Sequence, residues 1–211
     1  MLARFAALVG LTIAAFPAAT LPAAAETAIF AGGCFWCTES DMDHVPGVTS
    51  TVSGYTGGST DNPTYRDHAD HREAVQVEFD PGRISYAELT KIFFRTIDPT
   101  DGGGQFCDRG HSYSPAVYTN GASQKQAAEA AKAEAAKTLG KPIATEIAAA
   151  KKFWPAEDYH QNFWQSQEKM LTFAGYKPRA EHYKYYREGC GRDARLKEVW
   201  GSEALQGVAG H

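Results

Sequence analysis

The stretch IFAGGCFWCTESD, residues 29–41, decides the fold because it contains a junction between a strand and a helix. The short apolar run of residues 27–32 ends in glycine and predicts a strand. Residues 34–44 have the polar outer face and acidic content of the first turns of a helix, so Gly32 and Gly33 are expected to form the turn. Two cysteines, Cys34 and Cys37, lie on the first turn of this helix.

Strand and helix patterns alternate on the C-terminal side of this junction. Residues 48–58 are β-branched and end in a glycine pair, and residues 73–82 alternate polar and apolar side chains before an Asp-Pro-Gly turn. Ser85 and Glu88 form a capping box at the start of an amphipathic helix, and residues 114–120 predict another strand. The order β-α-β-β-α-β predicts an α+β fold with a ferredoxin-like split βαβ sheet and two helices on one face.

The rest of the chain adds helices and a tail. Residues 122–138 are rich in Ala, Lys, Glu and Gln and predict a helix. Residues 145–167 predict a strand, a turn at Pro155 and another helix. Beyond Gly175 the sequence is aromatic, basic and irregular, so we expect a catalytic domain over residues 26–175 and an irregular C-terminal tail over residues 176–211.

The first residues have the pattern of a secretory signal. Arg4 precedes an apolar run, residues 5–16, that is too short to span a bilayer, and three alanines end the segment at position 25. We expect residues 1–25 to be removed and the mature protein, starting at Glu26, to be periplasmic or extracellular. The remaining chain is long enough for one core, and a net charge of −4 gives no reason to expect nucleic acid or an anionic membrane as partner.

The position of Cys34 favours nucleophilic chemistry. A cysteine at a helix N-terminus is near unpaired N–H groups and the positive end of the helix dipole, which favour the thiolate. Cys37, one turn later, is placed to trap an oxidised Cys34. A structural bridge, half of a zinc site and a thioredoxin-type pair are alternatives. Zinc is disfavoured because Cys107 and Cys190 stand alone, and a thioredoxin-type pair normally encloses small residues or proline where this chain has two aromatic ones.

Seven motifs occur in order over roughly residues 28–163: GCFWC, SGYTGG, NPTY, HREAVQVEFDP, ISYAEL, DRGHSYSPAVY and EIAAAKKFWPAEDYHQ. In these motifs the chain resembles the A-type peptide methionine sulfoxide reductases. The resemblance implies a monomeric thiol oxidoreductase that reduces the S-epimer of methionine sulfoxide, free or in proteins, and so repairs oxidised proteins. It implies no metal or organic cofactor, and a thioredoxin-like protein as reductant. A disulfide-exchange protein and a non-enzymatic module with bridged cysteines are rival interpretations, and the motif series weighs against both.

The resemblance also implies roles for individual residues. Cys34 attacks the sulfoxide sulfur, and Glu73 protonates or hydrogen-bonds the sulfoxide oxygen, which requires a carboxyl group kept partly neutral by burial. Two tyrosines bind the same oxygen, an aspartate supports the pocket, and two aromatic residues hold the substrate's methyl group. In this sequence these residues correspond to Tyr65 and Tyr113, Asp108, and Phe35 and Trp36.

Attack on the sulfoxide leaves a sulfenic acid on Cys34, which a second thiol must resolve. Cys190, between two glycines in the tail, and Cys37 are both candidates. Cys107 has no counterpart role in the family pattern and is expected to be a buried free thiol. Of two further histidines, we expect His71 to face water rather than to tune Glu73, and His160 to have a structural role in a cap or in the core.

Overall fold

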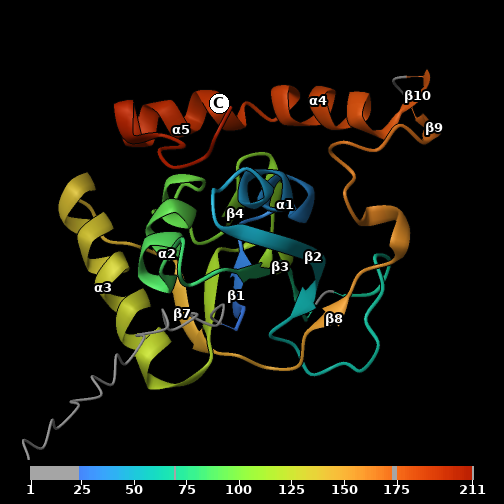
Figure 1. Ribbon diagram of the computed structural model, residues 1–211. Helices are drawn as coiled ribbons and strands as arrows, with labels where there is room; N and C mark the ends of the chain where they lie inside the picture. Colours follow the sequence, from blue (N-terminus) through green and yellow to red (C-terminus); the bar gives the residue numbers. More distant parts are fainter. Residues whose placement is uncertain (1–23, 69, 173–174, 211) are drawn as a thin grey trace, which may run out of the picture.

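A computed structural model describes residues 24–68, 70–172 and 175–210 (Figure 1). Almost all of the expected signal peptide, residues 1–25, lies outside this part of the chain. No helix within the described ranges is long and apolar enough to cross a membrane.

A six-stranded sheet forms the centre of the molecule. Its strands, in the spatial order β7-β6-β1-β3-β2-β8, are β7 (Glu146–Ala149), β6 (Ala116–Thr119), β1 (Glu26–Ala31), β3 (Arg72–Phe79), β2 (Val48–Thr56) and β8 (Trp154–Pro155). All neighbours are antiparallel except β6 and β7. The inner strands, in the order β6-β1-β3-β2, have the arrangement of a split βαβ sheet, which confirms the expected α+β fold.

Two helices, α1 (Phe35–Asp43) and α2 (Tyr86–Arg95), pack on one face of this sheet. Alternate strand residues point into that layer, and the ring of Phe30 stacks on Phe93 of α2 with centroids 4.5 Å apart. The expected capping box begins α2, because the Ser85 hydroxyl accepts a hydrogen bond from the Glu88 N–H. Helix α3 (Gly121–Leu139) packs against α2 and buries a row of alanines.

Residues 145–167 differ from the prediction of a strand, a turn and a helix. The first strand is β7, but Pro155 lies within β8, and the only helix is the 3-10 helix η2 (Asp158–His160), which is followed by turns over residues 161–165. Gln161 holds this segment against the edge of the sheet. Its side-chain amide accepts a hydrogen bond from the N–H of Ser53 and donates one to the carbonyl of the same residue. The amide thus continues the pairing of β8 along the edge of β2.

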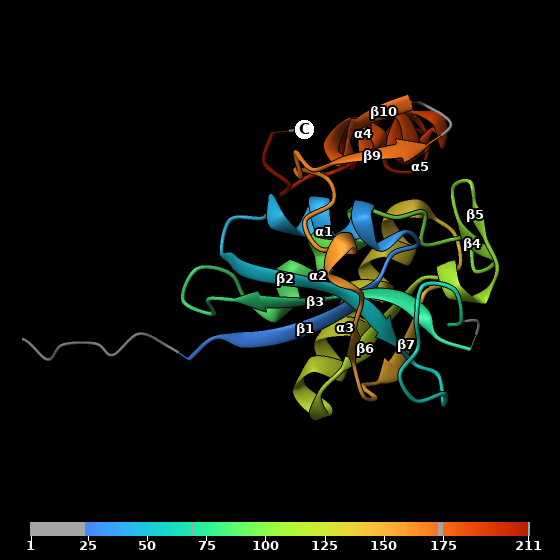
Figure 2. The same ribbon diagram turned by 90° about the vertical axis from the view of Figure 1, so that its right-hand side faces the viewer.

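The C-terminal segment is more regular than the expected tail. It contains the hairpin of β9 (Lys169–Thr172) and β10 (Gly175–Pro178), the helices α4 (Arg179–Gly189) and α5 (Arg192–Trp200), and the 3-10 helix η3 (Gly201–Glu203). Figures 1 and 2 show α4 and α5 lying across α1. The predicted polar outer face of α1 is therefore buried. Asp41 on that face pairs with the guanidinium groups of Arg187 at 2.7 Å and Arg192 at 3.4 Å.

Candidate active site

Cys34 is held at the N-cap of α1 by the tight turn after β1. Gly33 has a φ of +85°, and a Cβ atom there would lie 2.6 Å from the Cβ of Gln105. A Cβ at Gly32 would lie 2.6 Å from the hydroxyl oxygen of Thr38. The two glycines thus form the predicted turn, and the Cys34 carbonyl accepts the first helical hydrogen bonds from Cys37 and Thr38.

Glu73, on β3, reaches the same helix end. Its Oε2 accepts a hydrogen bond of 2.9 Å from the N–H of Phe35, the first residue of α1. Burial raises the pKa of Glu73 to about 8, although the Phe35 hydrogen bond opposes the shift, and the nearby Asp108 carboxyl raises it further. The carboxyl group is therefore largely protonated at neutral pH and can donate a proton into the site.

A cavity of about 50 Å³ lies at this helix end. Its walls bring together residues from β1–α1, β3, the loop before β3, the small hairpin of β4 (Gly104–Gln105) and β5 (Asp108–Arg109), the 3-10 helix η1 (His111–Tyr113), and α4. Seven of the eight lining residues are those that the sequence predicted for catalysis and substrate binding, and the eighth is Tyr186: Cys34, Phe35, Trp36, Tyr65, Glu73, Asp108, Tyr113 and Tyr186.

The hydroxyl groups of Tyr65 and Tyr113 are hydrogen-bond donors in this cavity. Burial raises the pKa of Tyr65 to about 12 and raises the pKa of Tyr113 further, with an added contribution from the charge of Glu73. Both hydroxyl groups therefore keep their protons at neutral pH. The loop of Tyr65 is fixed by its own N–H, which donates to Oε1 of Glu157 at 3.0 Å.

Tyr186 is a site residue that the sequence interpretation missed. Its hydroxyl donates a short hydrogen bond to Oδ2 of Asp108, and its ring meets the Trp36 ring edge-on with centroids 6.0 Å apart. Burial raises the pKa of both Tyr186 and Asp108. A signal was present: Tyr183, Tyr186 and Arg187 have the i, i+3, i+4 spacing of one helix face, but the segment was interpreted as irregular.

The histidines have structural positions. His160 is buried, accepts a 3.1 Å hydrogen bond from the Trp36 indole N–H, and has a pKa lowered to about 4 by burial, which agrees with the expected structural role. The expectation that His71 faces water is wrong. His71 is buried and bonds the Gly58 N–H and the Thr60 carbonyl, which closes the β2–β3 loop. His68 is the histidine near Glu73, with Nε2 and Oε1 3.9 Å apart.

The thiols of Cys34 and Cys37 are both free and buried. Burial raises the pKa of Cys34 well above its usual range, and so do the neighbouring Cys37, Glu73 and Asp108. The hydrogen bond with Cys34 lowers the pKa of Cys37 despite its burial, and the positive charges of Arg192 and Arg187 lower it further. The negative charge of this thiol pair is thus favoured on Cys37, near the two arginines, and Cys34 keeps its proton. Its position at the helix N-terminus alone had predicted a thiolate at Cys34, that is, a lowered pKa.

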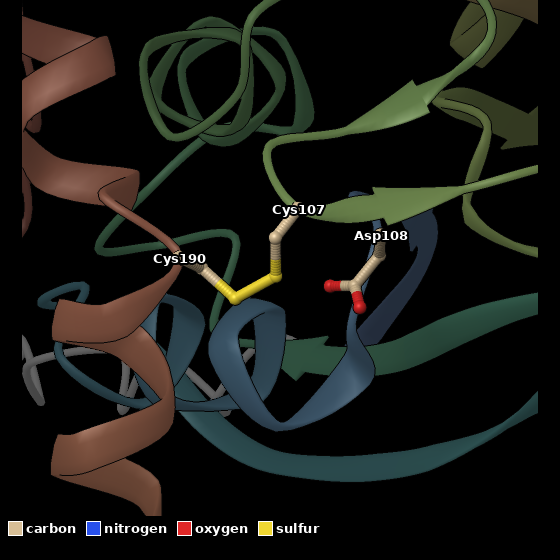
Figure 3. Close-up of side chains that lie close together, drawn as sticks. All are labelled: Cys107, Asp108 and Cys190. Carbon is tan, nitrogen blue, oxygen red and sulfur yellow. A yellow bond between two sulfur atoms is a disulfide. The ribbon is translucent and has the colours of Figure 1, made fainter.

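Cys107 and Cys190 form a disulfide with their Cα atoms 5.0 Å apart (Figure 3). The expectation that Cys107 is a buried free thiol is therefore wrong, because it lies exposed between β4 and β5, beside α4. Figure 3 shows Asp108 next to the bridge, and the first turn of α1 passes beneath it. The donor atoms of these three residues lie within 4.8 Å of one another, but the two sulfur atoms are bonded together and offer no thiolate to a metal. Cys190 borders an open depression of about 600 Å³.

Comparison with known proteins adds to this geometry. The family model described as peptide methionine sulfoxide reductase matches residues 26–193. The peptide methionine sulfoxide reductase MsrA 2 of Rhizobium meliloti (strain 1021) is 52% identical over 194 residues, covering 90% of this chain and 92% of that protein. The MsrA of Bacillus subtilis (strain 168) is 45% identical over 184 residues, covering 84% and 97%.

Two solved structures are also similar. Methionine sulfoxide reductase A of Corynebacterium diphtheriae has 34% sequence identity and a TM-score of 0.62, covering 66% of this chain and 73% of that one. Mxr1 from Saccharomyces cerevisiae in its reduced form has 30% identity and a TM-score of 0.60, covering 66% and 83%.

Proposed function

The chain belongs to the peptide methionine sulfoxide reductase family, which makes it an oxidoreductase that reduces methionine sulfoxide, and we propose that Cys34 attacks the sulfur of the S-epimer. The observation that carries the proposal is the cavity that Cys34 and the protonated Glu73 line together with Tyr65 and Tyr113. A sulfoxide needs a nucleophile at sulfur and a proton at oxygen, and these groups supply both.

In the first step the Cys34 sulfur bonds to the sulfoxide sulfur while Glu73, Tyr65 and Tyr113 hold the oxygen. The bound sulfoxide accepts the proton of Glu73, and the Cys34 proton returns to that carboxylate. Oxygen then passes to Cys34 as a sulfenic acid, and methionine leaves as the thioether. The sulfoxide sulfur gains two electrons and the thiol loses two. Phe35 and Trp36 form the apolar wall for the methyl group.

Cys190 is proposed to resolve the sulfenic acid and Cys107 to receive the disulfide. The Cys190 thiol condenses with the Cys34 sulfenic acid, and its proton leaves with the hydroxyl group as water while a Cys34–Cys190 bond forms. Cys107 then attacks Cys190, so that Cys34 is freed and the Cys107–Cys190 bond of Figure 3 remains. The buried Cys37 is a poorer end point, because a protein reductant cannot reach it.

The exposed Cys107 gives a dithiol protein access to that bond. A thioredoxin-like reductant attacks Cys107, releases Cys190 as a thiol and leaves with its own disulfide. The open depression beside Cys190 supports this role, because it gives the approaching partner room. The N-terminal pattern supports export, in which case the reductant acts in the periplasm or outside the cell and the substrates are oxidised proteins there.

The test is a single turnover of the fully reduced protein with one equivalent of each resolved epimer, followed by thiol blocking and disulfide mapping. The S-epimer is expected to yield methionine and the Cys107–Cys190 bond, and the R-epimer neither. Cys107→Ser is expected to trap Cys34–Cys190, and Cys190→Ser to leave a sulfenic acid on Cys34 that reacts with dimedone.

Cys37→Ser is the matched control for this route, because Cys37 is the other thiol near Cys34. It is expected to give the same final bond as the unmodified protein. If Cys37→Ser formed no disulfide, and Cys190→Ser instead formed a Cys34–Cys37 bond, Cys37 would be the thiol that resolves the intermediate. Turnover by Cys34→Ser would refute the assignment of the nucleophile.

A further inference from the structure

We propose that an apolar groove next to the catalytic cavity binds a large apolar side chain of the substrate polypeptide, one or two residues from the methionine sulfoxide. This inference rests on the proposed function, since it assigns the groove to the same substrate. It makes oxidised, unfolded protein segments better substrates than free methionine sulfoxide. The groove has a volume of about 190 Å³ and lies between Phe163, β9 and α4.

The groove and the catalytic cavity share a wall. Trp36 and Tyr186 line both spaces, and their ring centroids are 6.0 Å apart. Trp36 is fixed in this position because it stacks on Phe163 at 3.8 Å and donates to His160. Any molecule that lies in the groove is therefore next to a molecule held at Cys34.

The two volumes suggest a division of the substrate between the spaces. The cavity at Cys34 has a volume of about 50 Å³ against about 190 Å³ for the groove, so it takes the sulfoxide end of one side chain and not a peptide segment. The main chain and the neighbouring residues of a bound peptide must lie outside. A chain in extended conformation advances about 3.3 Å per residue and returns to the same side every second residue, so it crosses the shared wall within two residues.

The groove is suited to an apolar occupant because the polar groups in its lining are already bonded. His182 is the histidine among its lining side chains. One ring nitrogen lies 3.0 Å from the Thr172 hydroxyl and the other 3.1 Å from the Met170 carbonyl oxygen. The rest of the wall consists of the aromatic residues and the side chain of Met170. Burying a leucine, methionine or phenylalanine side chain there removes apolar surface from water without stranding a polar group.

Exposed apolar side chains extend this surface around the site. Within the described ranges, three exposed tyrosines lie at the groove or at His160: Tyr185 on α4, Tyr65 in the loop before β3 and Tyr159 in η2. The rings of Tyr65 and Tyr159 lie 4.5 and 4.1 Å from the His160 ring. A surface of this kind fits the sequence around a methionine from a protein core, which unfolding exposes together with its apolar neighbours.

The experiment compares kcat/KM for two peptides, with dithiothreitol as the electron source. Each carries one methionine S-sulfoxide, and they differ only in leucine or serine two residues away; a second pair places the substitution on the other side. We expect the leucine peptide to be better by roughly tenfold on one side. Met170→Gln, on the groove wall, is expected to bring that ratio near one. Leu171→Gln is the matched control, because Leu171 neighbours Met170 on β9 and is 76% exposed outside the groove.

Several outcomes would overturn the proposal. Equal kcat/KM for leucine and serine peptides in the unmodified protein would exclude an apolar subsite, while their turnover would still establish the reductase. If neither Met170→Gln nor Tyr185→Ser changed the ratio of kcat/KM between the leucine and serine peptides, the apolar contact would lie elsewhere. If these variants instead raised only the KM for a thioredoxin, the groove would dock the reductant. Failure to reduce any sulfoxide would refute the proposed function itself, and the subsite with it.

Discussion

Glu73 links the fold to the chemistry at the scale of a single residue. One carboxylate oxygen caps the first N–H of α1, and the same side chain lines the cavity at Cys34. Because the carboxyl is buried with only this bond, it holds its proton to about pH 8. The helix start and the proton donor are thus fixed to each other by one contact.

The first prediction concerns the pH dependence of sulfenic acid formation. Because the protonated carboxyl is the active form, the single-turnover rate is expected to fall as the pH rises through about 8. Glu73→Gln should lower the rate by about 10²- to 10⁴-fold and remove this fall. Rapid-quench kinetics from pH 6 to 10 provide the measurement. Glu78→Gln, an exposed position on the same strand, is the control, and an unchanged fall in Glu73→Gln would assign the titration to another group.

The predicted site residues show what the sequence carries and what it leaves out. The lining residues up to Tyr113 occur in short motifs whose order and spacing identify a family, so their roles could be predicted together. Tyr186 contributes through contacts with Asp108, 78 residues away, and with Trp36, and no local pattern encodes either contact. The prediction that Cys107 is a free thiol was wrong for the same reason, because its disulfide partner Cys190 is distant in the sequence.

At the scale of elements, the strands were predictable and the coverage of α1 was not. Alternation in β3 and the capping box of α2 are local signals, and both elements form as expected. The polar residues of α1 indicate a solvated face when they are considered alone. Arg187 and Arg192 arrive from the C-terminal helices and pair with Asp41, which lets this face be buried.

The second prediction tests that contact. Arg187 bonds Asp41, Asp193 and the Tyr183 hydroxyl at a buried position, so Arg187→Ala is expected to lower the free energy of unfolding by about 3–5 kcal/mol. Arg195 of α5 also pairs with carboxylates, but its side chain is 47% exposed, and Arg195→Ala should cost less than about 1 kcal/mol. Urea denaturation monitors both variants. Equal, small losses would mean that the burial of Asp41 does not depend on Arg187.

At the scale of the whole molecule, the order of elements predicted the central sheet, and its outer edges came from tertiary contacts. Strand β8 depends on the Gln161 amide that bonds Ser53, and β7 pairs parallel with β6 after a long connection through α3. Neither pairing has a periodic signature in the sequence. The C-terminal helices close over the sheet's helical layer. The acidic side chains that the folded protein buries are Glu39, Asp41, Glu73 and Asp98.

The third prediction follows from two of those groups. Burial raises the pKa of both Glu39 and Glu73 to about 8, whereas an unfolded glutamate titrates near 4.3. Between these values the folded protein holds protons that the unfolded chain releases, so stability falls as the pH rises toward 8. The expected slope is about 1.4 kcal/mol per pH unit for each group. Urea unfolding at several pH values should show it, and Glu39→Gln should remove one group's share. If stability fell with pH as steeply in Glu39→Gln as in the unmodified protein, the raised pKa of buried Glu39 would be contradicted.

The Cys107–Cys190 bond joins residues separated by 83 positions and so closes a loop that contains β6, α3, β7 and the hairpin of β9 and β10. A cross-link over such a span restricts the unfolded chain and adds about 4–5 kcal/mol to stability in the chain-entropy model. On the proposed route this cross-link forms after every turnover and disappears when the reductant arrives. Resistance to heat and to proteases then rises when the supply of electrons falls, and molecules that wait longest for a reductant are the most durable.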